Sequence, residues 1–441
     1  MIVGKTECGL AYAVKRSGSS VGYCALSIRC GTRDEEGFHS GIAHFTEHTV
    51  FRGTEHKSAS VINGYLDRLG GELNAYTTKE EIVFHATVLK EDLAKAAGLL
   101  FELATEPVFP EKEIATEKGV VIDEIQSYKD SPADDVYDRF EEALFDGHPL
   151  GGAILGTVAS VKKITSEELK RFVKANFTPD RMAFTVVADV DEARMERALL
   201  RLVSKFFSIS HGLSMEKVCS TDSPSDGPSS YKSGCGTAVD GHASGGMVEQ
   251  SVKEVPRNRF DKTVDKRNHE VNAVIGGLAP SLYDRQDRIT AVLLANILGG
   301  PASNSILNGI LREKNGWVYG VECGYTQYRD TGIMAISMGC DKENLEKCFS
   351  AIDKAVIELQ EKPLSERKLK AAKKQLLGQL AISSESGESQ CLSMGKSLLA
   401  FGRVATDAEN KSAVEAVTAQ DLQEMAKRIF DKTQISRLVF L

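Results

Sequence analysis

Apolar and polar positions follow two different periods along this chain. Residues 82–88, Ile-Val-Phe-His-Ala-Thr-Val, alternate between two faces, which predicts a β-strand. Between such segments lie long stretches that predict amphipathic helices. Because strands and helices do not alternate strictly, we expect an α+β fold with largely antiparallel sheets and helices packed on one face of each.

The same order of elements occurs twice. Residues 80–125 and residues 331–380 each contain an alternating strand, a helix start rich in Lys and Glu, an amphipathic helix, a proline break and a further helix. An offset of 255 residues sets Leu364 on Phe109 and Leu369 on Ile114. We therefore expect two homologous domains.

A serine-rich and glycine-rich segment separates the two copies. Residues 208–246 hold ten serines and seven glycines, which predicts a flexible linker. The first domain is then residues 1–205, the linker residues 206–262 and the second domain residues 263–441. The linker contains His211, Cys219, Cys235 and His242, but it lacks a Cys-x-x-Cys or comparable zinc spacing, so we do not interpret it as a metal site.

Composition restricts the class of protein. With 441 residues and 42% hydrophobic positions, the chain is too long for one core. Its net charge of -8 argues against general nucleic-acid binding. The nine scattered cysteines are typical of reduced, intracellular thiols. Because no signal peptide and no run of 18 apolar residues is present, we expect a cytoplasmic protein without a membrane partner, although a targeting segment removed earlier would leave no trace.

The segment GIAHFTEHTVF, residues 41–51, places two histidines and a glutamate in an apolar run. On a helix over residues 42–53, His44 and His48 lie one turn apart on one face, and Glu47 lies beside them. Two such imidazoles can bind one Zn²⁺, with Glu47 as the base for a metal-activated water. The order His-x-x-Glu-His is the inverzincin signature. The alternative is two core or surface histidines beside an unrelated glutamate.

A third ligand would decide between these interpretations. Glu117 and Glu124 are seven residues apart in a helix-like segment, residues 113–132, and so share a face. The apolar residues 119–122 between them favour a buried helix, where a carboxylate needs a cation. The alternative is a solvated helix face.

Several separated motifs, in order, resemble the pitrilysin family of zinc peptidases, which includes insulysin and the mitochondrial processing peptidase, in its two-domain short form. They are GIAHFTEHTVFRGT, LGGELNAYTTKEE, EKGVVIDEI, HPLGGAILGT and NILGGPASNSILNGILREKNGWVYGV, at residues 41–54, 69–81, 117–125, 148–157 and 296–321. The resemblance implies a zinc metalloendopeptidase that hydrolyses short or unfolded peptides. A scaffold or partner subunit of the same family is the alternative, but such members usually have broken zinc motifs.

The resemblance also assigns roles to residues. The family's third zinc ligand lies 76 residues beyond the second histidine, which falls on Glu124 and completes one Zn²⁺ site with His44 and His48. Glu47 is then the general base, and Glu117 the helix glutamate that supports catalysis.

Substrate contacts follow from the resemblance in the same way. Asn74 and Ala75 match the segment to which the substrate backbone adds as a strand. Arg312 and Tyr319 match a pair that holds substrate and stabilises charge, although Trp317 between them replaces the family's usual leucine.

The second copy cannot repeat the metal site. At the offset of 255, Gln379 stands at Glu124 and Ala372 at Glu117, and no histidine follows His269. Family geometry places the zinc site of one subunit opposite the second domain of another. We therefore expect a homodimer, with a heterodimer as the alternative. The sequence identifies neither the substrate nor the cleavage preference.

Overall fold

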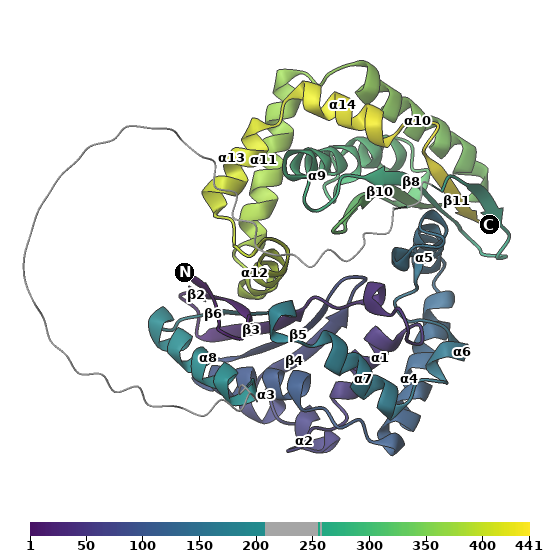
Figure 1. Cartoon of the computed structure of the whole chain (residues 1–441). Helices are drawn as coiled ribbons and strands as arrows, with labels where there is room; N and C mark the ends of the chain where they lie inside the picture. Colours follow the sequence, from purple (N-terminus) through teal and green to yellow (C-terminus); the bar gives the residue numbers. More distant parts are fainter. Residues whose placement is uncertain (208–254, 256–257) are drawn as a thin grey trace, which may run out of the picture.

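The computed structural model describes residues 1–207, 255 and 258–441. Most of the predicted linker, including His211, Cys219, Cys235 and His242, lies outside the described residues. The described chain forms two halves, each built around one sheet (Figure 1).

The first half contains a six-stranded sheet with the strand order β1-β2-β6-β3-β5-β4. Neighbouring strands are antiparallel except β2 and β6, which are parallel. Strand β4 lies at the open edge of the sheet and pairs only with β5. The strands are β1 Ile2–Lys5, β2 Ala11–Arg16, β3 Val21–Ile28, β4 Glu72–Thr77, β5 Ile82–Leu89 and β6 Met182–Ala188.

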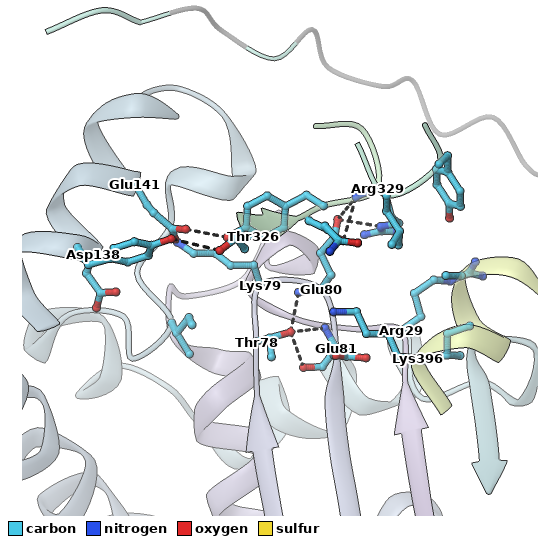
Figure 2. A pocket seen from close by; sticks show the side chains of 18 residues that line it. Arg29, Thr78, Lys79, Glu80, Glu81, Asp138, Glu141, Thr326, Arg329 and Lys396 are labelled. Carbon is cyan, nitrogen blue, oxygen red and sulfur yellow. Dashed lines mark hydrogen bonds and ion pairs between the residues drawn. The ribbon is translucent and has the colours of Figure 1, made fainter. Parts of the chain in front are cut away.

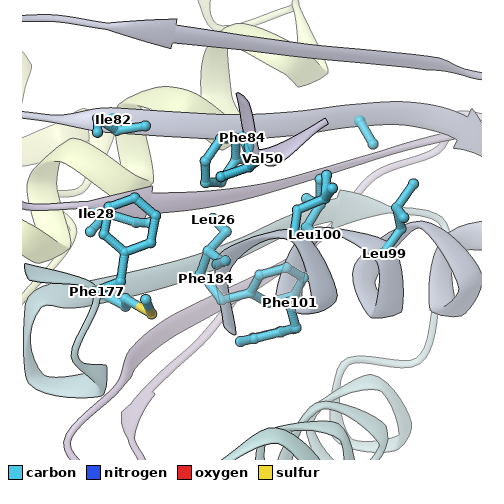
Figure 3. Close-up of a cluster of buried hydrophobic side chains, with 14 of the residues drawn as sticks. Leu26, Ile28, Val50, Ile82, Phe84, Leu99, Leu100, Phe101, Phe177 and Phe184 are labelled. Atoms are coloured by element: carbon cyan, nitrogen blue, oxygen red, sulfur yellow. The ribbon is translucent and has the colours of Figure 1, made fainter. Parts of the chain in front are cut away.

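The alternation predicted for residues 82–88 is confirmed in β5. Phe84 joins Leu26 of β3 in a core that α1 and α3 cover (Figure 3). Val83 belongs to a separate cluster on the opposite face. The helices of this half are α1 Ile42–Val50, α2 Ala59–Asn63, α3 Leu93–Thr105, α4 Glu111–Lys129, α5 Pro132–Leu144, α6 Val158–Val161, α7 Ser166–Asn176 and α8 Glu192–Phe206.

The second half repeats this sheet without β1. Its strand order is β7-β11-β8-β10-β9, with the parallel pair β7 and β11 at the position of β2 and β6. This correspondence confirms the duplicated α+β fold. The elements are β7 Asp261–Val264, β8 Val271–Ala279, β9 Val318–Gln327, β10 Gly332–Cys340, β11 Ser436–Phe440, the π-helix η6 Asn308–Lys314, α9 Arg285–Gly299, α10 Leu345–Glu361, α11 Glu366–Ser383, α12 Gly387–Phe401, α13 Asp407–Ala416 and α14 Ala419–Ile429.

Each half also supplies one helix to the sheet of the other half (Figure 1). Helix α12 crosses to the first sheet and packs on β2, β3 and β6, where Met394 and Leu398 join a buried cluster with Ala25. Helix α5 crosses to the second sheet, where Phe140 packs with Leu438. Each sheet is therefore covered on both faces, and the second face is covered by a helix from the other half.

Charged side chains join the halves at one end of this interface. Arg33 of the first half lies 2.7 Å from Glu80 and also pairs with Asp330 of the second half. Arg329 of the second half lies 3.0 Å from Glu80. These ion pairs and the exchanged helices hold the two halves in one arrangement.

Candidate metal centre

Helix α1 presents the His-x-x-Glu-His motif because its start is fixed by buried contacts. Gly41 has a φ of 87°, and a Cβ there would lie 2.6 Å from the carbonyl oxygen of Leu155, so the turn into the helix requires glycine. The Glu35 carboxylate accepts hydrogen bonds from the backbone N–H groups of Gly41 and Ala43, at 2.9 and 3.0 Å. The first turn of α1 is thereby capped just before His44.

The structure brings His44, His48 and Glu124 together. The Nε2 atoms of His44 and His48 lie 3.7 and 3.5 Å from Oε2 of Glu124 on α4. Ligand atoms about 2.1 Å from a tetrahedral zinc are about 3.4 Å apart, so these separations suit three ligands of one ion. Oε2 of Glu124 is buried and has no hydrogen-bond partner among the described residues. A cation at this position would satisfy it.

The histidines are held as metal ligands require. Nδ1 of His48 forms a hydrogen bond of 2.9 Å with Oε1 of Glu117. The other ring nitrogen, Nε2, is thereby directed at Glu124. Arg52 lies 2.5 Å from the other oxygen of Glu117. Burial alone would raise the pKa of Glu117, but its contacts with His48 and Arg52 lower it overall. Glu117 is therefore an anion that orients His48.

Burial and neighbouring charges set the protonation of both imidazoles. Burial, together with the nearby His48, lowers the pKa of His44 to about 3. Burial would also lower the pKa of His48, but the Glu117 hydrogen bond and the surrounding carboxylates raise it overall. His44 is thus a neutral imidazole at physiological pH, the form that binds a metal.

Glu47 lies beside this group and contacts the edge strand. Its Oε2 accepts a hydrogen bond of 2.8 Å from the hydroxyl of Thr77, the last residue of β4. Burial raises the pKa of Glu47, while the Thr77 hydrogen bond and the charge of His48 oppose the shift. A carboxylate in this setting is a suitable general base.

The other predicted site residues lie on two edge strands. Asn74 is exposed and Ala75 half-buried on β4. Arg312 is exposed on η6, and Tyr319 is 61% exposed on β9 with its hydroxyl donating to Asp341 at 2.7 Å. Strand β9 is the edge strand of the second sheet, and neither Arg312 nor Tyr319 belongs to the group of His44, His48 and Glu124.

Sequence reasoning missed Arg52 and the individual role of Thr77. Arg52 stands four residues after His48, one turn along from the ligand, and that spacing was the available signal. Thr77 fell inside the segment expected to contact substrate, but nothing in its spacing indicates a contact with Glu47.

The second half holds an amide pair in place of a metal ligand. Asn296 of α9 donates to Gln379 of α11 at 2.6 Å, and Gln379 is the counterpart of Glu124. Across the described part of the chain, the group of His44, His48 and Glu124 is the one cluster that could hold a metal ion.

Comparison with family models decides the relationship. Residues 12–158 match insulinase (peptidase family M16), and residues 163–376 match the peptidase M16 inactive domain. The chain belongs to peptidase family M16. The first match contains His44, His48 and Glu124, and the second contains Asn296 of the amide pair and ends three residues before Gln379.

Relatives in this family carry names that include zinc. A Bacillus subtilis protein named as an uncharacterized zinc protease is 28% identical over 412 residues, which cover 93% of this chain and 91% of the relative. A Rickettsia felis protein with the same description is 26% identical over 414 residues, or 94% and 91% of the two chains. This chain is therefore a member of a protease family whose relatives are described as zinc enzymes.

Solved structures share the M16 fold. A protease from Helicobacter pylori has a TM-score of 0.82 at 19% identity, and the match covers 100% of this chain and 98% of that one. A peptidase M16 inactive domain from Pseudomonas fluorescens has a TM-score of 0.83 at 17% identity, with 100% and 97% coverage. In the described part of this M16 chain, no helix has the length and apolar character needed to cross a membrane.

Proposed function

We propose that this chain is a zinc-dependent metalloendopeptidase. The observation that supports this proposal is the convergence of His44, His48 and Glu124 on one point, with Glu47 beside them. A bound Zn²⁺ would polarise the scissile carbonyl and lower the pKa of a water ligand to about 7. The cytoplasm remains the proposed location.

Different residues around the metal group would have different roles in the reaction. Glu47 takes the proton of the attacking water and later delivers it to the leaving amine. Thr77 holds the Glu47 carboxylate toward the metal group at the end of β4. Glu117 and Arg52 keep the His48 ring in its orientation.

The substrate would bind as an added strand on β4. Its free edge offers backbone hydrogen-bonding groups at Asn74 and Ala75, next to the helix that carries the metal ligands. Such pairing needs an extended backbone, so short or unfolded peptides are the proposed substrates. Neither a nucleic acid nor a membrane is part of this proposal.

A second subunit would complete the site. Arg312 and Tyr319 are exposed on the second half and are free to face another chain. We propose a homodimer in which this pair binds the substrate held at the partner's metal group. A heterodimer with a related subunit is the alternative assembly.

Cleavage of an unstructured peptide, with zinc measured by elemental analysis, tests the proposed function. The wild type should hold one zinc per chain and lose activity with a chelator. Glu47→Gln should retain the zinc and lose turnover by about 100-fold or more. Glu124→Gln should lose the zinc, whereas Asp123→Asn, an exposed neighbour on the same helix, should keep it. Full turnover in Glu47→Gln, or full zinc content in Glu124→Gln, would show that the assignment is wrong.

A further inference from the structure

A cavity of about 310 Å³ lies between the two halves. It is walled by the turn after β4, by α5 and by the end of β3 from the first half, and by α12 and the residues after β9 from the second half (Figure 2). None of His44, His48 and Glu124 lines it. The cavity is therefore distinct from the metal centre, and its volume is at the small end of the range for small-molecule sites.

Unpaired charges of opposite sign lie on opposite sides of this cavity. Asp138 of α5 lines one side, whereas Arg29 of β3's end and Lys396 of α12 line the other (Figure 2). Within the described chain, none of these three side chains has an ion pair or a hydrogen bond. The neighbouring charges are already used, because Glu80 pairs with Arg33 and Arg329, and Lys79 lies 3.3 Å from Glu141.

The surroundings of Asp138 favour a cation. Although part of the Asp138 side chain is exposed, the burial of its carboxyl raises the pKa of that group to about 6. Lys79 opposes this shift, whereas Glu141 and Asp135 add to it. A positively charged group placed here would be attracted by Asp138, because Glu141 is already paired with Lys79 and Asp135 with Lys266.

The opposite side favours an anion. Arg29 and Lys396 are basic groups there, and the acidic Glu81, which feels the charge of Lys396, also lines the cavity. Burial raises the pKa of Glu81, with the charge of Lys396 opposing the shift. A single carboxylate therefore stands beside two cations. The apolar side chains of Ile154, Leu282 and Leu399 also line the cavity and can contact an apolar group of a ligand.

We propose that this cavity binds a short peptide of two or three residues in its zwitterionic form. The α-amino group lies at Asp138, the terminal carboxylate at Arg29 and Lys396, and an apolar side chain against Leu282 and Leu399. The ligand class rests on the proposed function, because a peptidase releases such peptides. The bound peptide contacts both α5 and α12 and so bridges the helices that the halves exchange.

The dipeptide Leu-Phe is the probe, and the full-length, zinc-loaded Glu47→Gln protein is the receptor, so that hydrolysis does not interfere. Titration calorimetry should show binding of Leu-Phe, and binding at least tenfold weaker for N-acetyl-Leu-Phe and for Leu-Phe amide. When Asp138→Asn is introduced into the Glu47→Gln protein, Leu-Phe and N-acetyl-Leu-Phe should bind with equal affinity. Adding Arg29→Gln and Lys396→Gln should remove the preference for the free carboxylate, whereas Lys342→Gln at an exposed site should change neither.

Zinc removal distinguishes binding of the dipeptide in the cavity from binding at the metal centre. Leu-Phe should bind equally well after the protein is treated with a chelator, and loss of binding would place the dipeptide at the metal group and overturn the inference. Unchanged selectivity in Asp138→Asn and in the Arg29 and Lys396 variants would overturn it as well. If the wild type cleaves no peptide but still shows this selectivity, the proposed function fails and the dipeptide site stands.

Discussion

At the scale of single residues, the orientation of His48 depends on a chain of contacts between two helices. Glu117 of α4 holds Nδ1 of His48, and Arg52, just beyond the end of α1, holds Glu117. Such partners behind a ligand fix the ring and its tautomer before the metal arrives. Arg52 therefore supports the proposed zinc site although it cannot itself bind a cation.

Replacing Arg52 tests this arrangement. In Arg52→Met, Glu117 loses its cation and His48 gains freedom to rotate, so zinc affinity should fall by about 10- to 100-fold. Competition with a chromophoric chelator measures the dissociation constant. Arg201→Met, on the exposed face of α8, is the matched control and should bind zinc like the wild type. Equal affinity in both variants would exclude a role for Arg52.

The grouping of His44, His48 and Glu124 was predictable because their spacing is local or known from related proteins. His44, His48 and Glu47 are fixed by one helix turn, and the position of Glu124 followed from the family resemblance. The contacts of Arg52 with Glu117 and of Thr77 with Glu47 join residues 65 and 30 positions apart. Such contacts depend on how α1, α4 and β4 pack, which the pattern of one chain does not specify.

At the scale of elements, α12 lies unusually close to the first sheet because small residues meet there. A Cβ on Gly395 would lie 2.4 Å from the hydroxyl oxygen of Ser27 on β3. Glycine in the middle of a helix normally costs stability, so its presence here is explained by this close approach.

A larger side chain at this position should separate α12 from the sheet. Gly395→Val should lower the free energy of unfolding by about 1–3 kcal/mol through overpacking, seen as a lower urea midpoint. Ser393→Val, on the exposed side of α12, should lower it by much less, since it has only the small helix penalty of a β-branched residue. Equal effects of the two substitutions would show that the contact does not limit the packing.

The exchange of helices was not predictable in the same way as the strands. Alternation identified β5, and the offset of 255 residues correctly related α4 to α11. The same offset relates α5 to α12, but an amphipathic pattern shows only that one face is buried. It does not show which sheet buries that face, so helices were expected on one face of each sheet.

At the scale of the whole molecule, the ion pairs of Arg33 between the two halves should make the stability of the fold depend on pH. Burial would raise the pKa of Asp330, but Arg33 lowers it below the ordinary value of 3.8. A carboxyl with a lowered folded-state pKa stabilises the fold above its unfolded pKa, and this contribution is lost as the pH falls through the folded value.

The variant Asp330→Asn tests this dependence. Because it leaves Arg33 without one partner, it should be about 3 kcal/mol less stable than the wild type at pH 7. Urea unfolding should show this difference shrinking as the pH falls below about 4. Asp180→Asn, at an exposed position, should follow the wild type at every pH. A difference that stays constant down to pH 2 would contradict the lowered pKa.

The proposed homodimer predicts complementation between two inactive variants. Mixed subunits of Glu47→Gln and Arg312→Gln would form one intact site and one doubly damaged site in each heterodimer. With random exchange, half of the dimers are mixed, so activity should recover to about a quarter of the wild-type value. Peptide cleavage before and after subunit exchange measures the recovery, and no recovery in proven heterodimers would refute sharing of sites.

The crossing of α5 and α12 has a consequence for how this protein reaches its native state. The first sheet remains open on one side until residues near 400 have been made, because α12 is its cover. A nascent chain that ends after α8 would expose Ala25, Val83 and Val187 as an apolar surface. The first half therefore cannot complete its fold during translation as a separate unit, and its apolar surface must wait for α12 or be shielded until then.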